Sequence, residues 1–304
     1  MTKFLRKSFF LIIIIIGLIY LYGFIINQLF SNGSYFKSQW INSLKDKNID
    51  CVIIGNSRAS LLSMNEEKVD YLNLAQDGIG MKITYIQLYL YLRNKNSTKY
   101  VILQGDYLSF NKTDDSRRSP RWLPYFSDPI IFELLKNEHS TFKYHKYFPA
   151  LNYILFNYDW GFSSLINNIF DIKKSPWGKR GYYNVCRNFI NEGPLGSVDY
   201  RNYKQNLFWV DKINELCKEN NSELIVITSP YYNMQDSITD IELFKSRLNK
   251  KDIYYFDFSR QFLGNSKLFR DNNHLNCYGV NEFQDILTNM LLNRKIENEN
   301  SCSH

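Results

Sequence analysis

Residues 49–60 read IDCVIIGNSRAS, and the prediction of the fold starts from this stretch. The apolar residues 52–54 are typical of a short interior strand, and Gly55 permits the sharp turn that follows it. Ser57 therefore stands just past the end of a buried strand, where the backbone can expose its hydroxyl group. Enzymes with α/β folds place nucleophiles at such positions, although a helix N-cap is an equally ordinary role for a single serine.

Strands and helices alternate along the chain, starting with a predicted first strand at residues 50–55. Strands that alternate with helices indicate a parallel sheet with helices on both faces. The predicted fold class is therefore α/β, with a doubly wound, flavodoxin-like parallel sheet. Besides a terminal helix with apolar residues at helical spacing, the predicted elements are strands at 69–75, 99–105, 223–230 and 252–258 and a helix at 82–93.

Residues 108–198 interrupt this alternation. The segment is rich in aromatic residues and is predicted to be mostly helical, and it is too long for a structureless loop in a compact domain. We interpret it as one large insertion in the sheet domain. Three roles stay open: a lid over a site, an accessory that only packs, and a surface that rests on a membrane or on a membrane partner.

The N-terminal region carries a predicted membrane anchor at residues 9–30. This run contains no charged residue and has the length of about 20 residues that crosses a bilayer. Lys3, Arg6 and Lys7 precede it, so the positive-inside rule places the N-terminus in the cytoplasm and the main domain outside. A cleaved signal peptide is the competing interpretation, but its apolar region is usually about 7–15 residues long and ends at a small-residue cleavage site.

The expected domain order follows from the anchor and the insertion. It is a cytoplasmic segment at 1–8, the transmembrane anchor at 9–30, a connecting helix at 31–48, the main domain at 49–293 with its insertion at 108–198, and a polar tail at 294–304.

Composition and charge restrict the partners. The net charge of +7 suits a domain near anionic lipid or an anionic envelope polymer, and it equally suits a solvated surface without a partner. No nucleic-acid module is recognisable, so no nucleic-acid partner is expected. The five cysteines lack metal-type spacing, and a Cys186–Cys217 disulfide is an option that the spacing does not require. No metal site and no organic cofactor are expected.

A serine nucleophile needs a base and a group that orients the base. Of the four histidines, His274 lies in RDNNHLNCYG, after the last predicted strand and before the final helix. Asp271 stands three residues earlier, and this spacing lets its carboxylate reach the imidazole Nδ1 within one turn. Ser57 and His274 should then meet at the carboxyl edge of the sheet, where doubly wound folds bind ligands.

These motifs resemble a known family. GNSRAS at residues 55–60 looks like the first block of the SGNH (GDSL-type) hydrolases, NLAQDG resembles the second, and DNNHLNCYG resembles the terminal D-x-x-H block with its glycine. The resemblance covers residues 49–105 and 222–293, and it implies that Ser57 is the nucleophile, His274 the base and Asp271 the orienting acid. Together with the anchor, the chain looks like the DltD-like proteins associated with O-acylation of envelope polysaccharides.

The resemblance leaves the oxyanion hole incomplete. The family uses the N–H of the nucleophile, a glycine N–H of the second block and an asparagine side chain of the third block. Ser57 and Gly78 match the first two, but Asp106 stands near the expected place of the asparagine. Losing one such donor costs about 10²–10³ in rate. Candidate substrate-binding residues are Arg58, Asn73 and Asp106, although Arg58 could instead brace the helix start and Asn73 could serve ordinary turn hydrogen bonding.

The sequence and the resemblance together predict a single-pass membrane protein with an extracytoplasmic serine esterase or acyltransferase domain. Its expected partner is an envelope glycan or another acylated polymer, modified by O-acetyl chemistry through a Ser57 acyl-enzyme. The resemblance also implies a multispanning membrane partner that donates the acyl group. Two alternatives stay open: a non-catalytic assembly factor with the same fold, and an esterase that acts on lipid.

Overall fold

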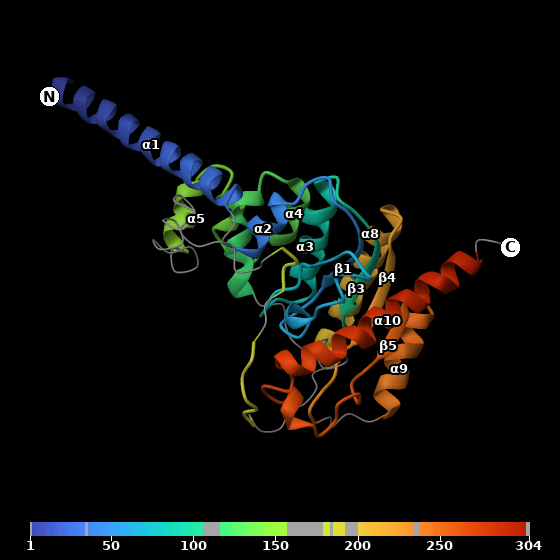
Figure 1. Cartoon of the computed structure of the whole chain (residues 1–304). Helices are drawn as coiled ribbons and strands as arrows, with labels where there is room; N and C mark the ends of the chain where they lie inside the picture. The colour runs from blue at the N-terminus through green and yellow to red at the C-terminus, as the bar shows by residue number, and fades with distance from the viewer. Residues whose placement is uncertain are drawn as a thin grey trace. The chain divides into compact units, whose positions relative to one another are not determined.

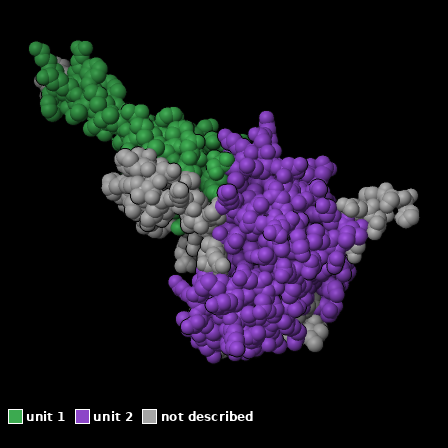
Figure 2. All heavy atoms as spheres, viewed as in Figure 1, with its two compact units in different colours: residues 1–43, 115–176 green, residues 44–114, 177–304 purple. Residues whose placement is uncertain are grey.

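The computed structural model describes residues 2–33, 36–105, 116–156, 179–182, 185–191, 200–233 and 238–301. The chain forms two compact units (Figure 2): one comprises residues 1–43 and 115–176, and the other comprises residues 44–114 and 177–304. The first unit contains the apolar N-terminal helix together with part of the insertion, and the second contains the sheet and the candidate site.

The second unit is built on a five-stranded parallel sheet (Figure 1) with the order β2-β1-β3-β4-β5. This is the flavodoxin-like order, in which the chain reverses its direction of travel across the sheet beside β1. The predicted doubly wound α/β fold is thus confirmed. The strands are β1 (Asn48–Ile54), β2 (Tyr71–Asn73), β3 (Ser97–Gln104), β4 (Glu223–Thr228) and β5 (Tyr254–Asp257).

Helices cover both faces of the sheet. One face carries Cys51, Ile53, Ile102 and Ile225, which pack with apolar side chains of the terminal helix α10 (Cys277–Ser301) in one continuous core. Alternate residues of a strand point to opposite faces. The other face is covered by α3 (Met81–Arg93), which contacts β1, and by α8 (Tyr200–Glu219), which contacts β4, and these two helices contact each other. Burial on both faces explains why the strands read as nearly continuous apolar runs.

The remaining described elements of this unit are three helices and two short 3₁₀ turns. They are η1 (Ala59–Leu61), α3 (Met81–Arg93), α8 (Tyr200–Glu219), α9 (Ile238–Asn249) and η5 (Ser266–Leu268). The helix α10 continues to Ser301, so the polar residues 294–301 extend this helix.

The first unit contains the long apolar helix α1 (Thr2–Ser31), which is long and apolar enough to cross a membrane. It is the only such helix in the described part of the chain. Most of its large apolar side chains are exposed. The other elements of this unit are α2 (Lys37–Ser43), η3 (Ser116–Tyr125), α4 (Pro129–Leu135), η4 (Phe142–Tyr144) and α5 (Pro149–Leu155).

Gly55 fits its position for two physical reasons. Its φ of +136° lies in a region that side-chain-bearing residues rarely adopt, and a Cβ atom there would lie 2.9 Å from the Cβ of Gln104 and 3.2 Å from that of Ala59. We expect Gly55→Ala to lower the free energy of unfolding by about 2–4 kcal/mol, because backbone strain and overpacking add. Chemical denaturation followed by circular dichroism would measure this.

Gly264→Ala is the matched control. Gly264 also has a positive φ, +75°, but no atom lies within 4 Å of the position that its Cβ would take. This variant should therefore lose only the contribution of backbone strain. Equal losses in the two variants would contradict the close-packing argument for Gly55.

Candidate active site

Ser57 lies in the turn that connects β1 to η1, at the carboxyl end of the sheet. The turn begins at Gly55, directly after β1 ends at Ile54. The side chain of Ser57 is partly exposed, and its Oγ lies 2.8 Å from the Nε2 of His274. The predicted approach of these two residues, which are 217 positions apart in the sequence, is therefore present in the structure.

Asp271 orients His274 within the loop between η5 and α10. The Nδ1 of His274 lies 2.8 Å from Oδ1 and 3.0 Å from Oδ2 of Asp271. Oδ1 also accepts the backbone N–H groups of Asn273 at 2.8 Å and of His274 at 2.9 Å. A carboxylate at Nδ1 favours the tautomer that carries its hydrogen on Nδ1, so Nε2 is left with a lone pair that faces the Ser57 hydroxyl.

The electrostatic environment keeps Asp271 ionised. Burial of the carboxyl is the largest single influence and by itself would raise the pKa. The hydrogen bond and charge of His274, the Asn273 N–H and the charge of Arg270 together outweigh burial and hold the pKa of Asp271 below its ordinary value of 3.8. The Nε of Arg270 lies 3.4 Å from Oδ2. Asp271 can therefore stabilise the imidazolium that forms when His274 accepts a proton.

Backbone hydrogen bonds hold the loop of Asp271 and His274 in place. The N–H of Arg270 donates to the carbonyl oxygen of His274 at 2.9 Å, which closes a tight turn around the pair. The segment 185–191 lies along this loop, because the N–H of Ile190 donates to the carbonyl oxygen of Arg270 at 2.8 Å and that of Cys277 donates to Val185 at 3.1 Å. The geometry of the base thus depends on a segment that the sequence did not connect with it.

The disulfide joins Cys186 to Cys277, and the Cys186–Cys217 option is wrong. Cys217 is a buried free thiol on α8, where it packs in the core. Cys277 opens α10 only three positions after His274, and its Cα lies 4.8 Å from that of Cys186. The bond therefore ties the segment 185–191 to the end of the loop that carries the candidate base.

Loss of this bond should affect both stability and the site. The disulfide spans 91 positions, and we expect Cys186→Ser to lower the free energy of unfolding by about 2–4 kcal/mol. The same variant should lower the rate of any Ser57-dependent reaction, since the loop of His274 loses a tether. Thermal melting with and without dithiothreitol measures the first effect. If the reductant destabilises the variant as much as the parent protein, another thiol pair is responsible.

Gly78 adopts a left-handed conformation with φ of +65° in an exposed turn. The preceding Asp77 accepts a hydrogen bond from Ser60 Oγ at 2.5 Å, and the same Oγ lies 2.8 Å from the carbonyl oxygen of Ser57. The turn of Gly78 is thereby linked to the turn of the candidate nucleophile. Asp106, the residue in place of the family's asparagine, lies outside the described residues.

The two other candidate substrate-binding residues have structural contacts. Arg58 is buried, and its guanidinium donates to the carbonyl oxygens of Ser229 and Pro230 and stacks 3.5 Å from the centre of the Tyr231 ring. These contacts link the turn after β1 to the segment that follows β4, which agrees with the bracing role.

Asn73 is fully buried. Its amide group donates to the carbonyl oxygens of Ala59 at 2.7 Å and Leu62 at 2.9 Å, and its Oδ1 accepts the N–H of Ala75 at 2.9 Å. Asn73 thus connects the end of β2 to both ends of η1. These contacts agree with the turn-stabilising interpretation.

Sequence reasoning missed two contributors to the site. Arg270 lies beside Asp271, and Cys186 covalently anchors the loop. The spacing of the cysteines carried no signal for this pairing, because the partners are brought together by the path of the chain around the sheet. Among the described residues, no group of three or more His, Cys, Asp or Glu side chains could hold a metal ion.

Comparison with known proteins finds solved structures that are similar to this chain. The sequence matches no protein-family model and no curated protein. A crystal structure from Bacteroides fragilis NCTC 9343, described as a "putative acylhydrolase", is similar over 84% of this chain and 94% of its own, with 10% sequence identity and a TM-score of 0.42.

Proposed function

We propose that this chain is a membrane-anchored serine esterase or acyltransferase that removes or transfers an O-acyl group, acetyl above all, on a cell-envelope glycan. One observation carries the proposal: the Ser57 hydroxyl, the His274 imidazole and the Asp271 carboxylate form a continuous hydrogen-bonded chain with contacts of 2.8 Å at each step. This arrangement gives a serine what it lacks by itself, a base that is held in the correct tautomer.

The reaction begins with proton transfer. Nε2 of His274 accepts the proton of Ser57 as Oγ attacks the acyl carbonyl, and a tetrahedral oxyanion forms. The N–H groups of Ser57 and Gly78 are its proposed donors. His274 then gives the proton to the departing alkoxide oxygen, which leaves the acyl group on Ser57. Water, or a hydroxyl group of an acceptor, attacks this ester while His274 again accepts and returns a proton.

Two features support an extracytoplasmic position for the catalytic unit. Lys3, Arg6 and Lys7 precede the apolar part of α1, so the positive-inside rule retains the N-terminus in the cytoplasm. The disulfide between Cys186 and Cys277 is a second, independent feature, because disulfides persist mainly in oxidising compartments. Transfer to a glycan, with a multispanning acyl-donating partner, is proposed from the resemblance of the sequence motifs.

A fluorophosphonate probe tests the proposal. The full-length protein in detergent should form a single covalent adduct, visible in its intact mass and mapped to Ser57, because only an activated hydroxyl reacts rapidly with such probes. His274→Ala should abolish the adduct. Asp285→Asn, on the exposed side of α10, is the control and should react like the parent protein. A folded protein that forms no adduct would rule out an activated Ser57.

The second candidate is a non-catalytic assembly factor that retains the fold. The observation that favours it is Asp106, a carboxylate where a donor to the oxyanion is expected, which would repel the developing negative charge. The two candidates differ in a cell that depends on this protein. Ser57→Ala should abolish envelope acylation if the site is catalytic and should preserve it if the protein only assembles other components.

A further inference from the structure

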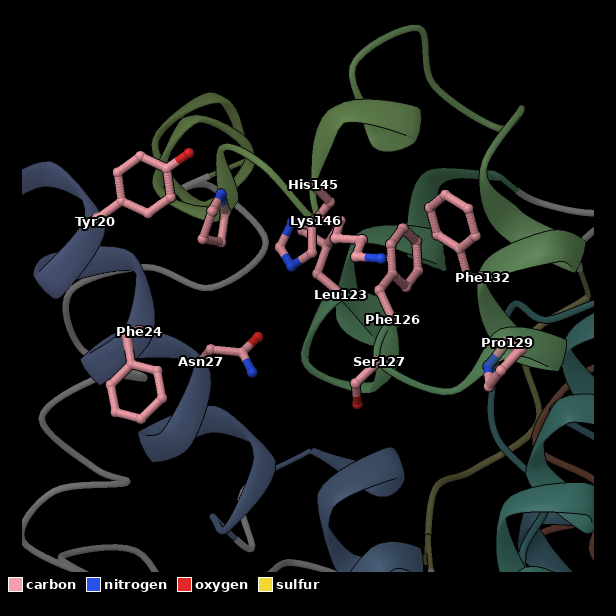
Figure 3. A pocket seen from close by; sticks show the side chains of 11 residues that line it. Tyr20, Phe24, Asn27, Leu123, Phe126, Ser127, Pro129, Phe132, His145 and Lys146 are labelled. Carbon is pink, nitrogen blue, oxygen red and sulfur yellow. The ribbon is translucent and has the colours of Figure 1, made fainter. Parts of the chain in front are cut away.

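A cavity of about 600 Å³ lies within the first unit (Figure 3). None of the described residues that line it belongs to the candidate active site. Its volume is within the range of about 300–1,000 Å³ that is typical of small-molecule sites. The described residues that line it come from α1 on one side and from residues 123–149 on the other. Most of the wall is apolar, formed by Tyr20, Phe24, Leu123, Phe126, Phe132 and Pro149.

The wall formed by α1 indicates the depth of the cavity. Tyr20, Phe24 and Asn27 lie in the C-terminal half of the uncharged run at 9–30. About 20 residues of helix cross the hydrocarbon, so this part of α1 belongs to the outer half of a bilayer if α1 spans it. The cavity therefore opens beside lipid chains, and this step rests on the proposed membrane anchoring of α1.

The helix α5 lies at the same depth and faces outward with apolar side chains. It packs directly on α1, since a Cβ on Gly23 would lie 2.8 Å from the backbone nitrogen of Ala150, and Tyr153 donates a hydrogen bond of 2.7 Å to Asn27. An exposed apolar surface of this extent is unusual in water and common at a membrane. Its exposed residues in and beside α5 are Tyr144, Tyr147, Phe148, Leu151, Ile154 and Leu155.

The polar part of the lining favours an anion. Lys146 lies among the lining side chains in Figure 3, and it has no ion pair or hydrogen bond with any of the residues that the structure describes. None of the described residues that line the cavity carries a carboxylate. His145 does not add a charge at neutral pH, because burial lowers its pKa to about 4, and Asn152 donates to its Nδ1 at 3.2 Å. Lys146 is thus the one cation of this lining.

We propose that the cavity binds one acyl chain of an anionic phospholipid from the outer leaflet, with the lipid phosphate next to Lys146. The apolar wall accepts the hydrocarbon chain, and the ammonium group satisfies the phosphate charge. The site is separate from the chemistry of Ser57, and it would hold the first unit at the outer leaflet by a specific lipid in addition to the helix α1.

Photochemical labelling of the full chain in bilayer nanodiscs tests this proposal. The probe is phosphatidylglycerol with a diazirine in one acyl chain, and labelled residues are mapped by mass spectrometry. We expect label on Phe24, Phe126 or Phe132 as well as along residues 12–16 of α1. Ser127→Trp, at the rim of the cavity, should reduce the cavity label at least about fivefold by filling the entrance. Ser140→Trp, exposed and not in the lining, should change nothing.

The headgroup assignment has its own variants. Lys146→Gln should reduce cavity labelling by the phosphatidylglycerol probe about threefold to fivefold and leave labelling by a phosphatidylcholine probe unchanged, while Lys146→Arg should retain both. If Lys146→Gln changes labelling by the two probes to the same extent, or changes neither, the anionic headgroup is overturned. Stronger cavity labelling by a diazirine fatty acid than by phosphatidylglycerol would overturn the phospholipid as the source.

The labels on α1 separate this inference from the proposed anchoring. Label at residues 12–16 without label in the cavity, or cavity label that Ser127→Trp leaves unchanged, overturns the lipid site while the anchor stands. Absence of label at residues 12–16 shows that α1 is outside the bilayer, and the inference then falls together with the anchoring. Thermal melting of each variant confirms that the protein is folded.

Discussion

Replacing Ser57 by alanine is expected to lower the rate of acyl-ester cleavage by about 10⁴–10⁶, because the whole covalent route begins at its Oγ. The His274 imidazole would lose its partner at 2.8 Å, but the fold should be unaffected, since the hydroxyl is partly exposed and makes this contact at the edge of the sheet. Hydrolysis of short-chain aryl esters by the full-length protein is the measurement. His274→Ala should cause a loss of similar size.

Non-additivity is the sharper test of the pair. Groups that act as a unit lose most of their effect when either one is removed, so the double variant of Ser57 and His274 should be about as slow as each single variant. Ser266→Ala, an exposed serine in η5, is the control and should retain full activity. If the two single losses multiply in the double variant, then Ser57 and His274 act independently and the proposed mechanism is wrong.

Replacing Asp271 by asparagine is expected to lower the same rate by about 10⁴, although the shape of the loop is retained. An asparagine amide would donate to Nδ1 of His274, and the imidazole hydrogen would then sit on Nε2, facing the Ser57 hydroxyl. Such a tautomer cannot accept the serine proton. Asp285→Asn removes an exposed carboxylate from α10 and should leave the rate unchanged.

The Asp271 variant also carries a pH signature. The pKa of Asp271 is lower in the folded protein than its ordinary value of 3.8, so the carboxylate contributes stability above that pH and loses this contribution as the pH falls through the folded-state value. The melting temperature of Asp271→Asn should therefore lie below that of the parent at neutral pH, and the difference should shrink in acid. A constant difference across this range would mean that the loss arises from packing alone.

The fold was largely predictable because its signals are local. Each strand of a parallel sheet that is buried on both faces must be an apolar run, and β1, β3 and β4 have such runs at 50–55, 99–105 and 223–230. The predicted strand at 69–75 is shorter in the structure, where β2 covers Tyr71–Asn73. Residues 69–70 and 74–75 lie outside the strand, although the N–H of Leu74 still donates to the carbonyl oxygen of Ile53 in β1 at 2.8 Å.

In the aromatic-rich segment, the helices were predictable from the sequence but their packing partners were not. The aromatic-rich segment 108–198 was predicted to be mostly helical, and α4 and α5 are helices in its described part. The packing of α5 on α1 was not predictable, because it depends on contacts such as that of Gly23 with Ala150. These two residues are far apart in the sequence, and they come into contact only because the chain folds back onto its N-terminal helix.

The amino-acid sequence alone predicted the long apolar N-terminal helix, the strand pattern, the serine after the first strand and the Asp271–His274 turn, because each depends on residues that are near one another in the chain. From the strand pattern it also predicted that Ser57 and His274 meet at the carboxyl edge of the sheet. Only the tertiary structure decided that Cys186 pairs with Cys277 and that Arg58 reaches the carbonyl of Pro230. These contacts join segments that are far apart in the chain. The sheet brings the segments together through non-local strand pairing, which the spacing of residues along the chain does not reveal.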